Sequence, residues 1–438
     1  MTKLKSAKCE HLSGEITVPG DKSISHRSLI FASQAIGTST IKGLLEGEDV
    51  IATSKALKAM GVDIKKQENG SWVVKGVGVG GLSEPECELD LGNSGTGVRL
   101  LMGLVAPYGF KTTFTGDASL KKRPMSRVMK PLEKMNIRFE SKTGGRLPLT
   151  VIGSDEIVPV RYELPVASAQ VKSAILLAGL NCRGETTVIE PVATRDHTEL
   201  MLKGFGAQIA ANENNNGGRE IKLKGQPELK AMDIDVPGDP SSAAFAVVAA
   251  LIVPGSEILI KNICTNPLRT GLYDTLLEMG ADIEFINKRD QAGEPVADVK
   301  VKYSKLKGVK VPAARAASMI DEYPILSVAA SVASGETLME GLEELRVKES
   351  DRLQAVSDGL EECGVKFESG SDWLKVIGGE VSGGGLVKTH LDHRIAMSFL
   401  ILGMVANEPV EVDDSETINT SFPNFVELIN VLGGKITS

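Results

Sequence analysis

The sequence lacks the features of a membrane-spanning or metal-binding protein. Its 438 residues contain no run of about 18 apolar residues, so we expect no transmembrane helix and no membrane partner. The first segment, MTKLKSAKCEHLSGE, has no apolar core, so we expect no signal peptide. The five cysteines form no CxxC pair, and the five histidines show no HExxH spacing. We therefore expect reduced cysteines, no metal, no cofactor and a cytoplasmic protein.

An excess of positive charge is also absent. The 49 Lys and Arg residues are outnumbered by 57 Asp and Glu residues, which gives a net charge of −8. Proteins that bind nucleic acids usually present a basic face to the phosphate backbone, so nucleic acid is not an expected partner. Small anions are not excluded, because a local cluster of Lys and Arg can dominate the field within a cleft. The length and the 42% hydrophobic content indicate a globular chain of two or three domains.

One pattern occurs six times along the chain. Each copy has a small or polar cluster, an alanine-rich apolar run, a β-branched stretch and an amphipathic run that ends near a Gly-hydrophobic-x-Ile signature. The signature positions are Gly61, Asn136, Gly206, Gly280, Gly364 and Gly433. Their spacing of roughly 70–85 residues is long for a solenoid repeat and suits a small packed α/β subdomain.

Each copy predicts two helices and several short strands. The apolar runs, which predict helices buried on most faces, cover residues 28–36, 98–106, 171–180, 243–253, 325–334 and 395–406. The amphipathic runs, which predict exposed second helices, cover residues 49–60, 126–135, 197–205, 272–279, 349–363 and 422–432. β-rich runs lie at residues 38–43, 111–116, 185–190, 256–261 and 411–414. One unit therefore reads βαβαββ, with the apolar helices inside and the sheets and second helices outside.

The segment Val-Pro-Gly-Asp occurs twice, at residues 18–21 and 236–239. Pro-Gly-Asp is common turn chemistry, so these could be two unrelated turns. Residues 16–37 and 234–255 align almost without gaps, however, which favours a pair of crossover points. We expect one domain of residues 1–20 plus 238–438 and an inserted domain of residues 21–237, each with three repeats.

The first copy carries charge where its buried helix should begin. Residues 20–27 read GDKSISHR and place Lys22 and Arg27 in the first turns. A helix N-terminus exposes free N–H groups and a partial positive charge, so it binds anions readily. The matching segment of the fourth copy, GDPSSAAF at residues 238–245, has no cation. The repeated fold therefore does not require Lys22 or Arg27, which favours an anion-binding role over a structural one.

Copies two and three open with polar clusters of another kind. Residues 91–99, LGNSGTGVR, are rich in glycine and hydroxyl groups and can bring backbone N–H groups close to a phosphate or carboxylate. They do not form a Walker A loop. The basic run 121–123 is either solvated or functional, and the proline after Arg123 constrains its direction. In copy three, Ser168 is either a plain helix N-cap or a ligand-binding residue.

The second half of the chain adds acidic residues. Asp321 precedes the fifth apolar helix, where an acidic N-cap is also ordinary helix chemistry. Residues 346–352, RVKESDR, hold six ionisable or hydroxyl side chains in seven residues. On a helix, Lys348 and Arg352 share a face at the i,i+4 step, although exposed charged helices are common. Arg394 begins the sixth apolar helix, and its burial would be costly without an anion.

Eight short motifs occur in an order that resembles one enzyme family. They are GDKSISHR (20–27), GNSGTGVRL (92–100), RPM (123–125), SAQVKSA (168–174), RDHTE (195–199), DEYP (321–324), RVKESDR (346–352) and DHRIAM (392–397). They extend over nearly the whole chain and look like the 5-enolpyruvylshikimate-3-phosphate synthase family of enolpyruvyltransferases. The resemblance implies an α/β (α+β) fold, a two-domain inside-out barrel of six βαβαββ units with an active site in the cleft between the domains.

The resemblance also implies a reaction, the transfer of the enolpyruvyl group from phosphoenolpyruvate to the 5-hydroxyl of shikimate 3-phosphate. Phosphate is released through a tetrahedral intermediate, on the pathway to chorismate and the aromatic amino acids, and we expect a monomer. The implied catalytic residues are Asp321 as the base and Glu349 with Lys22 as proton-transfer partners. The residues implied to bind shikimate 3-phosphate are Lys22, Ser23, Arg27, Ser168, Ala169, Gln170, Arg195, Asp321 and Lys348. Those implied to surround phosphoenolpyruvate are Lys22, Gly95, Arg123, Gln170, Arg352 and Arg394.

Two positions depart from the family pattern. Many members have a lysine where this chain has Thr420, in the segment TSFP, so a cation for the phosphoenolpyruvate phosphate is either lost or supplied from elsewhere. Ser94 stands before Gly95 where many members have alanine before glycine. Gly95 leaves room for analogues of phosphoenolpyruvate such as glyphosate, whereas Ser94 resembles the divergent branch of the family.

Two other functions agree with parts of the pattern. A sister enolpyruvyltransferase acts on a UDP-amino sugar and uses a cysteine in the loop that matches residues 117–124, where this chain has none. A non-catalytic anion-binding repeat protein would explain Lys22 and Arg394, but it would not explain Asp321 and Glu349.

Overall fold

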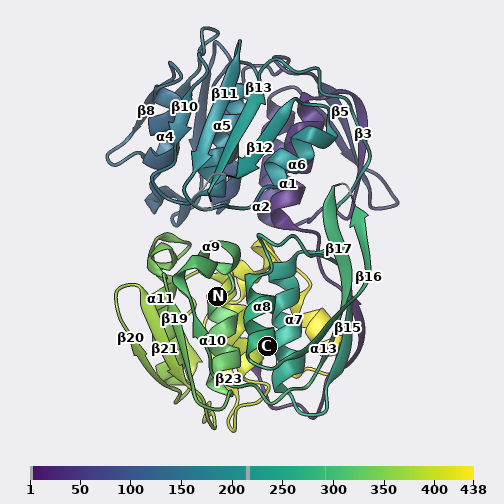
Figure 1. Ribbon diagram of the computed structural model, residues 1–438, viewed down its shortest axis with the longest axis vertical. Helices are drawn as coiled ribbons and strands as arrows, with labels where there is room; N and C mark the ends of the chain where they lie inside the picture. The colour runs from purple at the N-terminus through teal and green to yellow at the C-terminus, as the bar shows by residue number, and fades with distance from the viewer. Residues whose placement is uncertain (1–2, 214–217, 292) are drawn as a thin grey trace. The chain divides into compact units, whose positions relative to one another are not determined.

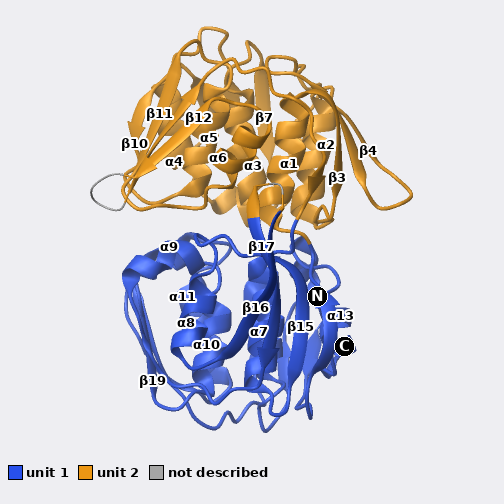
Figure 2. Ribbon diagram, turned by 45° about the vertical axis from the view of Figure 1, so that its right-hand side comes forward, with its two compact units in different colours: residues 1–19, 237–290, 295–438 blue, residues 20–236, 291–294 orange. Residues whose placement is uncertain are grey.

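The computed structural model describes residues 3–213, 218–291 and 293–438, and Figure 1 labels many of its helices and strands. The chain divides into two compact units (Figure 2). Unit 1 comprises Met1–Pro19, Pro237–Asp290 and Pro295–Ser438. Unit 2 comprises Gly20–Val236 and Gln291–Glu294.

Within its described residues, unit 2 has three four-stranded sheets around its helices (Figure 2). In order across the first sheet, the strands are β14 (Ile234–Asp235), β3 (Ile36–Lys42), β5 (Trp72–Val77) and β4 (Asp63–Lys66). The second sheet consists of β6 (Leu89–Asp90), β7 (Lys111–Thr115), β9 (Arg146–Ile152) and β8 (Arg138–Lys142). The third consists of β10 (Arg161–Glu163), β11 (Glu185–Glu190), β13 (Arg219–Lys224) and β12 (Ile209–Glu213). The helices are α1 (Lys22–Gln34), α2 (Glu48–Ala59), α3 (Gly95–Val105), α4 (Ser126–Glu133), α5 (Ala169–Gly179), α6 (His197–Gly204) and the short η1 (Leu120–Lys122).

Unit 1 repeats this plan. Its sheets are β16 (Asp282–Gln291), β17 (Glu294–Lys302), β15 (Glu257–Cys264) and β2 (Ser13–Thr17); β18 (Lys310–Val311), β19 (Glu336–Glu340), β21 (Trp373–Ile377) and β20 (Lys366–Ser369); and β22 (Leu386–Val387), β23 (Val410–Val412), β1 (Leu4–Ser6) and β24 (Ile436–Thr437). Its helices are α7 (Pro240–Ile252), α8 (Gly271–Glu278), α9 (Ala316–Met319), α10 (Tyr323–Ser331), α11 (Arg352–Glu362), α12 (His393–Leu402) and α13 (Phe425–Val431). The short helices are η2 (Ala313–Arg315), η3 (Glu343–Val347) and η4 (Glu416–Thr420).

The apolar helices lie inside the units, as predicted, and the expected α/β fold of βαβαββ units is confirmed. Every residue of α7 is buried, and so is most of α1, α3, α5, α10 and α12. Alanine and small residues allow these helices to approach closely, while their larger side chains fill the core. No helix among the described residues is long and apolar enough to cross a membrane.

The buried helices begin earlier than the apolar runs predicted, inside the polar opening clusters. α1 begins at Lys22, and Asp21 Oδ1 accepts a hydrogen bond of 2.8 Å from the Ile24 N–H. α5 begins at Ala169, and Ser168 caps it in the same manner. Cap side chains compensate the free N–H groups of a first helical turn. The opening clusters therefore belong to the first turns of the helices.

The six signature residues all follow the second helix of their copy in a left-handed conformation. They are Gly61, Asn136, Gly206, Gly280, Gly364 and Gly433, with φ between 71° and 113°. The next N–H group then bonds back into the helix, as Val62 N does to Leu57 O at 3.1 Å. This is a Schellman cap, which favours glycine or asparagine because a Cβ atom is strained at positive φ. Helix termination thus explains why the signature recurs.

The two Val-Pro-Gly-Asp segments mark an exchange of strands between copies one and four. β2 precedes the first segment but pairs in parallel with β15 of copy four, with Ile16 opposite Ile260. β14 precedes the second segment but pairs with β3 of copy one. At Gly20 an added Cβ atom would lie 2.0 Å from the Gly43 carbonyl oxygen, so no larger residue fits the crossover.

Candidate functional site

The start of α1 presents two cations with different surroundings. Lys22 Nζ forms an ion pair with Asp49 Oδ2 of α2, and its side chain is partly exposed. Arg27 is buried, and its Nε and Nη2 atoms donate hydrogen bonds of 2.7 Å to Thr198 Oγ1 and Ser173 Oγ. Among the described residues Arg27 has no carboxylate within ion-pair distance. Its positive charge is therefore held by hydroxyl groups and remains available to an anion.

Arg195 lies close enough to Arg27 for their charges to interact. It belongs to the segment between β11 and α6. Burial lowers the pKa of Arg27 to about 10; the charges of Glu199 and Asp21 partly offset this, and Arg195 adds to the lowering. Arg27 still remains charged at neutral pH. An anion bound beside both guanidinium groups would reduce the repulsion between them.

The starts of α3 and α5 are linked through Gln170. Its Oε1 atom accepts a hydrogen bond of 2.7 Å from Arg99 Nη1, and its Nε2 atom donates one of 2.9 Å to Thr96 Oγ1. Ser168 caps α5, since its Oγ atom accepts a hydrogen bond of 3.4 Å from the Val171 N–H. Ser168 therefore has an ordinary capping role in addition to any contact with a ligand.

The backbone groups of Ser23 and Ala169 already have partners within unit 2. The Ser23 carbonyl accepts a hydrogen bond of 3.0 Å from Arg27 Nη1. The Ala169 carbonyl accepts one of 2.7 Å from Ser173 Oγ. Both residues therefore help to build the surroundings of Arg27.

Gly95 lies against the guanidinium of Arg123. A Cβ atom added at Gly95 would lie 2.8 Å from Arg123 Nη1 and 3.1 Å from Arg99 Nη1. Arg123 Nη2 donates to Asn93 Oδ1 at 2.5 Å and to Ser119 Oγ at 3.3 Å. The loop 91–99 and the basic run 121–123 therefore meet at one guanidinium.

In unit 1, most of the predicted residues meet at Asp321. Its Oδ1 atom lies 3.0 Å from Arg352 Nη1 and 3.5 Å from Lys348 Nζ. Its backbone carbonyl accepts a hydrogen bond of 3.2 Å from Arg394 Nη1. The carboxylate is thus held between two cations. Asp321 is not the N-cap of α10, because Glu322 occupies that position.

Arg352 is enclosed by three carboxylates. Besides Asp321, its Nε atom binds Asp392 Oδ2 at 2.7 Å, and its Nη2 atom binds Glu349 Oε2. Its side chain is 1% exposed. Burial alone would lower the pKa of Arg352, but the three carboxylates raise it above its ordinary value. The guanidinium therefore stays positively charged. A ligand anion would have to bind beside the three carboxylates or displace one of them.

The prediction that Lys348 and Arg352 share one face of a helix is wrong. α11 begins at Arg352 with Asp351 as its N-cap, and η3 ends at Val347. Lys348 lies in the irregular segment between them, because the Asp351 side chain caps the helix by accepting from the Gln354 N–H at 3.1 Å. The two cations meet through Asp321 instead.

Arg394 has the anion that its burial required. Its Nη1 atom lies 3.6 Å from Glu322 Oε1, and its backbone N–H donates to Asp392 Oδ1 at 3.0 Å. The Nε and Nη2 atoms of Arg394 have no partner among the described residues. Part of this guanidinium is therefore able to bind a ligand.

The expectation that copy four has no cation at its helix start needs a correction. Arg269, from the segment between β15 and α8, places Nη2 at 3.1 Å from Asp239 Oδ1 and 2.9 Å from Ser241 Oγ. This cation comes from outside the aligned segment, so the comparison of aligned segments missed it. Copy four still lacks a counterpart of Lys22 or Arg27 on the helix itself.

Sequence reasoning missed the residues that hold the predicted ones in place. They are Asp49, Asn93, Arg99, Thr198, Glu322 and Asp392. Five of these stand inside the quoted motifs and only Asp49 lies outside them, so a polar or charged side chain within a motif was the available signal. In the described part of the chain, no group of three or more His, Cys, Asp or Glu side chains is arranged to hold a metal ion.

Thr420 occupies the place of the family lysine at the end of η4. Its Oγ1 atom lies 3.3 Å from Nδ1 of His393, the first residue of α12. His393 is therefore the ionisable side chain beside this position, next in sequence to Arg394.

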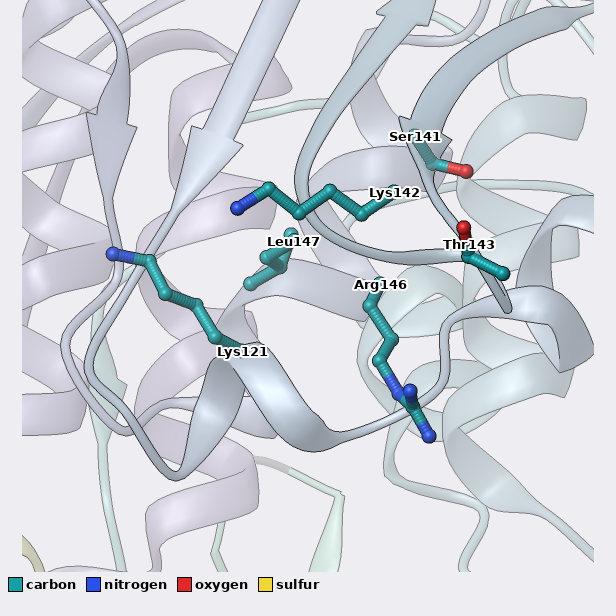
Figure 3. Close-up of a pocket in the computed structure, with 6 residues that line it drawn as sticks. All are labelled: Lys121, Ser141, Lys142, Thr143, Arg146 and Leu147. Atoms are coloured by element: carbon teal, nitrogen blue, oxygen red, sulfur yellow. The ribbon is translucent and has the colours of Figure 1, made fainter.

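A hollow of about 530 Å³ on unit 2 is lined by none of the residues assigned to the substrates, although Lys121 of the basic run 121–123 borders it. Figure 3 shows its lining, which consists of Lys121, Ser141, Lys142, Thr143, Arg146 and Leu147. The Arg146 side chain points away from the two lysines, and its Nε atom donates to the Lys122 carbonyl at 3.1 Å. The predicted site therefore does not depend on this hollow.

Comparisons with known proteins agree with the resemblance found in the motifs. The family described as EPSP synthase (3-phosphoshikimate 1-carboxyvinyltransferase) matches residues 7–429. The 3-phosphoshikimate 1-carboxyvinyltransferase of Paramagnetospirillum magneticum is 61% identical over 436 residues, which cover 99% of this chain and 98% of that protein. The protein of the same name from Brucella abortus is 59% identical over 428 residues, with 97% and 95% covered. The EPSP synthase structure from Acinetobacter baumannii has a TM-score of 0.88 and 42% identity, with both chains fully covered. The chain therefore belongs to the EPSP synthase family.

Proposed function

We propose that the chain transfers the enolpyruvyl group of phosphoenolpyruvate to the 5-hydroxyl of shikimate 3-phosphate and releases phosphate. This is the reaction of the family, and it places the chain on the route to chorismate and the aromatic amino acids. The observation that carries the proposal is the position of Asp321 between Lys348 and Arg352. A carboxylate fixed in place by two cations suits a general base, and simple anion binding would not need it.

We assign the first substrate to the cations and hydroxyl groups at the starts of α1 and α5. Arg27 and Arg195 would bind the phosphate or the carboxylate of shikimate 3-phosphate, because guanidinium groups bind these anions in a bidentate manner. The other residues assigned to this substrate are Lys22, Ser23, Ser168, Ala169, Gln170, Asp321 and Lys348. The absence of a carboxylate partner for Arg27 in the described residues supports this assignment.

We assign phosphoenolpyruvate to Lys22, Gly95, Arg123, Gln170, Arg352 and Arg394. Arg394 supports this assignment because two of its guanidinium nitrogens have no partner in the described residues. Arg352 would have to exchange one of its three carboxylates for the ligand. Gly95 supports it because a side chain there would collide with Arg123.

The chemistry follows from the proposed positions. Asp321 would accept the proton of the 5-hydroxyl as that oxygen attacks C2 of phosphoenolpyruvate. Glu349 and Lys22 would deliver a proton to the methylene carbon C3, which gives the tetrahedral intermediate. Loss of a proton from C3 and of phosphate from C2 would then restore the double bond. Cations around both substrates would stabilise the charge that develops at phosphate and carboxylate.

One assay separates this function from its rivals. Phosphate release from phosphoenolpyruvate should require shikimate 3-phosphate. Release that depends on a UDP-amino sugar would identify the sister activity, which the family match does not favour. No release with either acceptor would leave an anion-binding protein.

We also propose that the enzyme acts as a monomer in the cytoplasm. The cysteines support the compartment, because all five are free thiols and four are buried, which suits a reducing environment. Sedimentation analysis at several protein concentrations would test the oligomeric state. A concentration-dependent dimer would overturn that part of the proposal.

A further inference from the structure

A buried ionic cluster is formed in unit 2 by side chains of α5, the end of β11 and the start of α6, three elements that Figure 2 labels in the orange unit. At its centre is Lys172 of α5, whose side chain is 0% exposed. Its Nζ atom lies 3.0 Å from Glu190 Oε1 and 2.7 Å from Glu199 Oε1. The two carboxylates are also buried, so three charged groups meet away from water. Such a cluster is costly unless its members compensate one another.

Glu199 depends on this lysine. Neither of its carboxylate oxygens receives a hydrogen bond in the described structure, and its compensation is the ion pair with Lys172. Burial raises the pKa of Glu190, and the charge of Lys172 opposes that change. Removal of the lysine would therefore leave two buried acids without their ion-pair partner.

The cluster forms two hydrogen bonds with Thr194, the residue that precedes Arg195. Lys172 Nζ donates a hydrogen bond of 3.3 Å to the Thr194 carbonyl. The Thr194 hydroxyl in turn donates to Glu190 Oε1. Thr194 is thus fixed through both its main chain and its side chain, which sets the direction in which the chain enters Arg195.

The same cluster borders the residues that hold Arg27. Ser173 follows Lys172 and accepts a hydrogen bond from Arg27 Nη2 at 2.7 Å. Thr198 precedes Glu199 and accepts one from Arg27 Nε at 2.7 Å. The ion pair between Lys172 and Glu199 therefore ties together the two positions of α5 and α6 that orient the guanidinium.

The repeat supplies an internal comparison for Lys172. It stands four residues after the N-cap of its buried helix. The residues four places after the other N-caps are uncharged: Ser25, Val98, Ala243, Leu326 and Ala396. Burying a lysine is therefore not a requirement of the repeated fold. It is an addition confined to the copy that carries Arg195.

We propose that Lys172 is a positioning residue for shikimate 3-phosphate. Through Glu190 and Thr194 it orients Arg195, and through Glu199 it orients the hydroxyl groups that hold Arg27. The proposal rests on the assignment of Arg27 and Arg195 to that substrate. Loss of the cluster would let both guanidinium groups turn away from the geometry that binds the anion, while the contacts of Arg123 and Arg394 would remain.

Steady-state kinetics on the full chain would test the proposal with Lys172→Met. We expect KM for shikimate 3-phosphate to rise about tenfold, equivalent to about 1.4 kcal/mol, with kcat and KM for phosphoenolpyruvate within about threefold. Calorimetric titration with shikimate 3-phosphate alone should show the same loss of affinity. Lys203→Met is the matched control, because Lys203 is an exposed lysine near the end of α6, and it should leave both constants unchanged.

A second variant keeps the test decisive if Lys172→Met does not fold. Thr194→Val removes the hydroxyl link to Glu190 and leaves Lys172 in place. We expect the same selective increase of KM for shikimate 3-phosphate, at about threefold. A wild-type KM for this substrate in Thr194→Val and in any folded Lys172→Met would overturn the proposal. A parallel change in the constants of both substrates would also overturn it, since a general structural defect acts in that way.

A third variant, Arg195→Gln, distinguishes the positioning role of Lys172 from the assignment of Arg195 to shikimate 3-phosphate. If Arg195→Gln leaves KM for shikimate 3-phosphate unchanged, the assignment of Arg195 itself is wrong. If Arg195→Gln raises that KM while Thr194→Val and Lys172→Met do not, only the positioning role of Lys172 is rejected.

Discussion

Arg352 Nη1 donates a hydrogen bond of 3.0 Å to Asp321 Oδ1, so a fully buried cation fixes the proposed base. Because Asp392 and Glu349 bind the other nitrogens of the guanidinium, Arg352 has little freedom to turn. The carboxylate is therefore presented in one orientation. This relationship joins a residue assigned to catalysis with one assigned to phosphoenolpyruvate, and it gives a direct test of both.

Asp321→Asn should separate turnover from binding. The amide keeps the size of the side chain and can still accept a hydrogen bond from Arg352, but it cannot take up the hydroxyl proton. We expect kcat to fall by about 100-fold or more, the range in which general bases contribute. Affinity for shikimate 3-phosphate, measured by calorimetry, should change by less than about tenfold. A variant with normal kcat would remove Asp321 from the role of base.

Gly95→Ala should weaken phosphoenolpyruvate selectively. The new methyl group would lie 2.8 Å from Arg123 Nη1, closer than a carbon and a nitrogen can approach without a shift of the guanidinium. We expect KM for phosphoenolpyruvate to rise about tenfold. KM for shikimate 3-phosphate serves as the internal control and should stay near the wild-type value. Equal effects on both substrates would contradict the placement of Gly95 beside phosphoenolpyruvate.

His26 should make the folded state sensitive to acid. It is fully buried on α1, with Nδ1 at 2.8 Å from Thr53 Oγ1. Burial lowers its pKa well below 6.5, and the charges of Lys22 and Arg27 lower it further. The unfolded chain takes up a proton as pH falls below about 6.5, whereas the folded chain does not. Stability from this group is therefore present above that pH and lost below it, by up to about 1.4 kcal/mol per pH unit.

Urea unfolding at pH 7.5, 6.5 and 5.5 would measure the effect of His26. The free energy of unfolding should fall more steeply with acid in the wild type than in His26→Gln. Parallel curves for the two proteins would show that the buried imidazole does not carry this dependence.

Gly280→Ala should destabilise the protein although its surroundings are open. No atom lies within 4 Å of the added Cβ, but φ is +90°, where a side chain is strained. We expect a loss of about 1–2 kcal/mol in the free energy of unfolding. Gly379→Ala is the matched control, since its Cβ also meets no atom within 4 Å and its φ is not in the left-handed range. Equal stability of the two variants would contradict the role of the helix cap.

The sequence predicted much of the architecture because the repeat reflects local rules. The apolar runs predicted the buried helices, and Gly61 and its counterparts predicted where the second helices end. Helix starts were less accurate, because an N-cap such as Asp351 depends on the orientation of one side chain. The cations of the site were visible in the motifs. Which side chains pair with these cations was not visible, because the contacts of Lys22 with Asp49 and of Arg27 with Thr198 each join two different helices.

The exchange of strands sets an order in which the chain can assemble during synthesis. Unit 2 is continuous from Gly20 to Val236 apart from the short piece Gln291–Glu294, and β14 is the last strand of that continuous part. β2 emerges early but must wait for its partner β15, and β1 must wait for β23 and β24 near the end of the chain. Unit 2 can therefore close first, while the earliest segment remains unpaired. A ribosome that stalls after β14 would release one finished half and an unpaired leading strand, which is a hazard for aggregation.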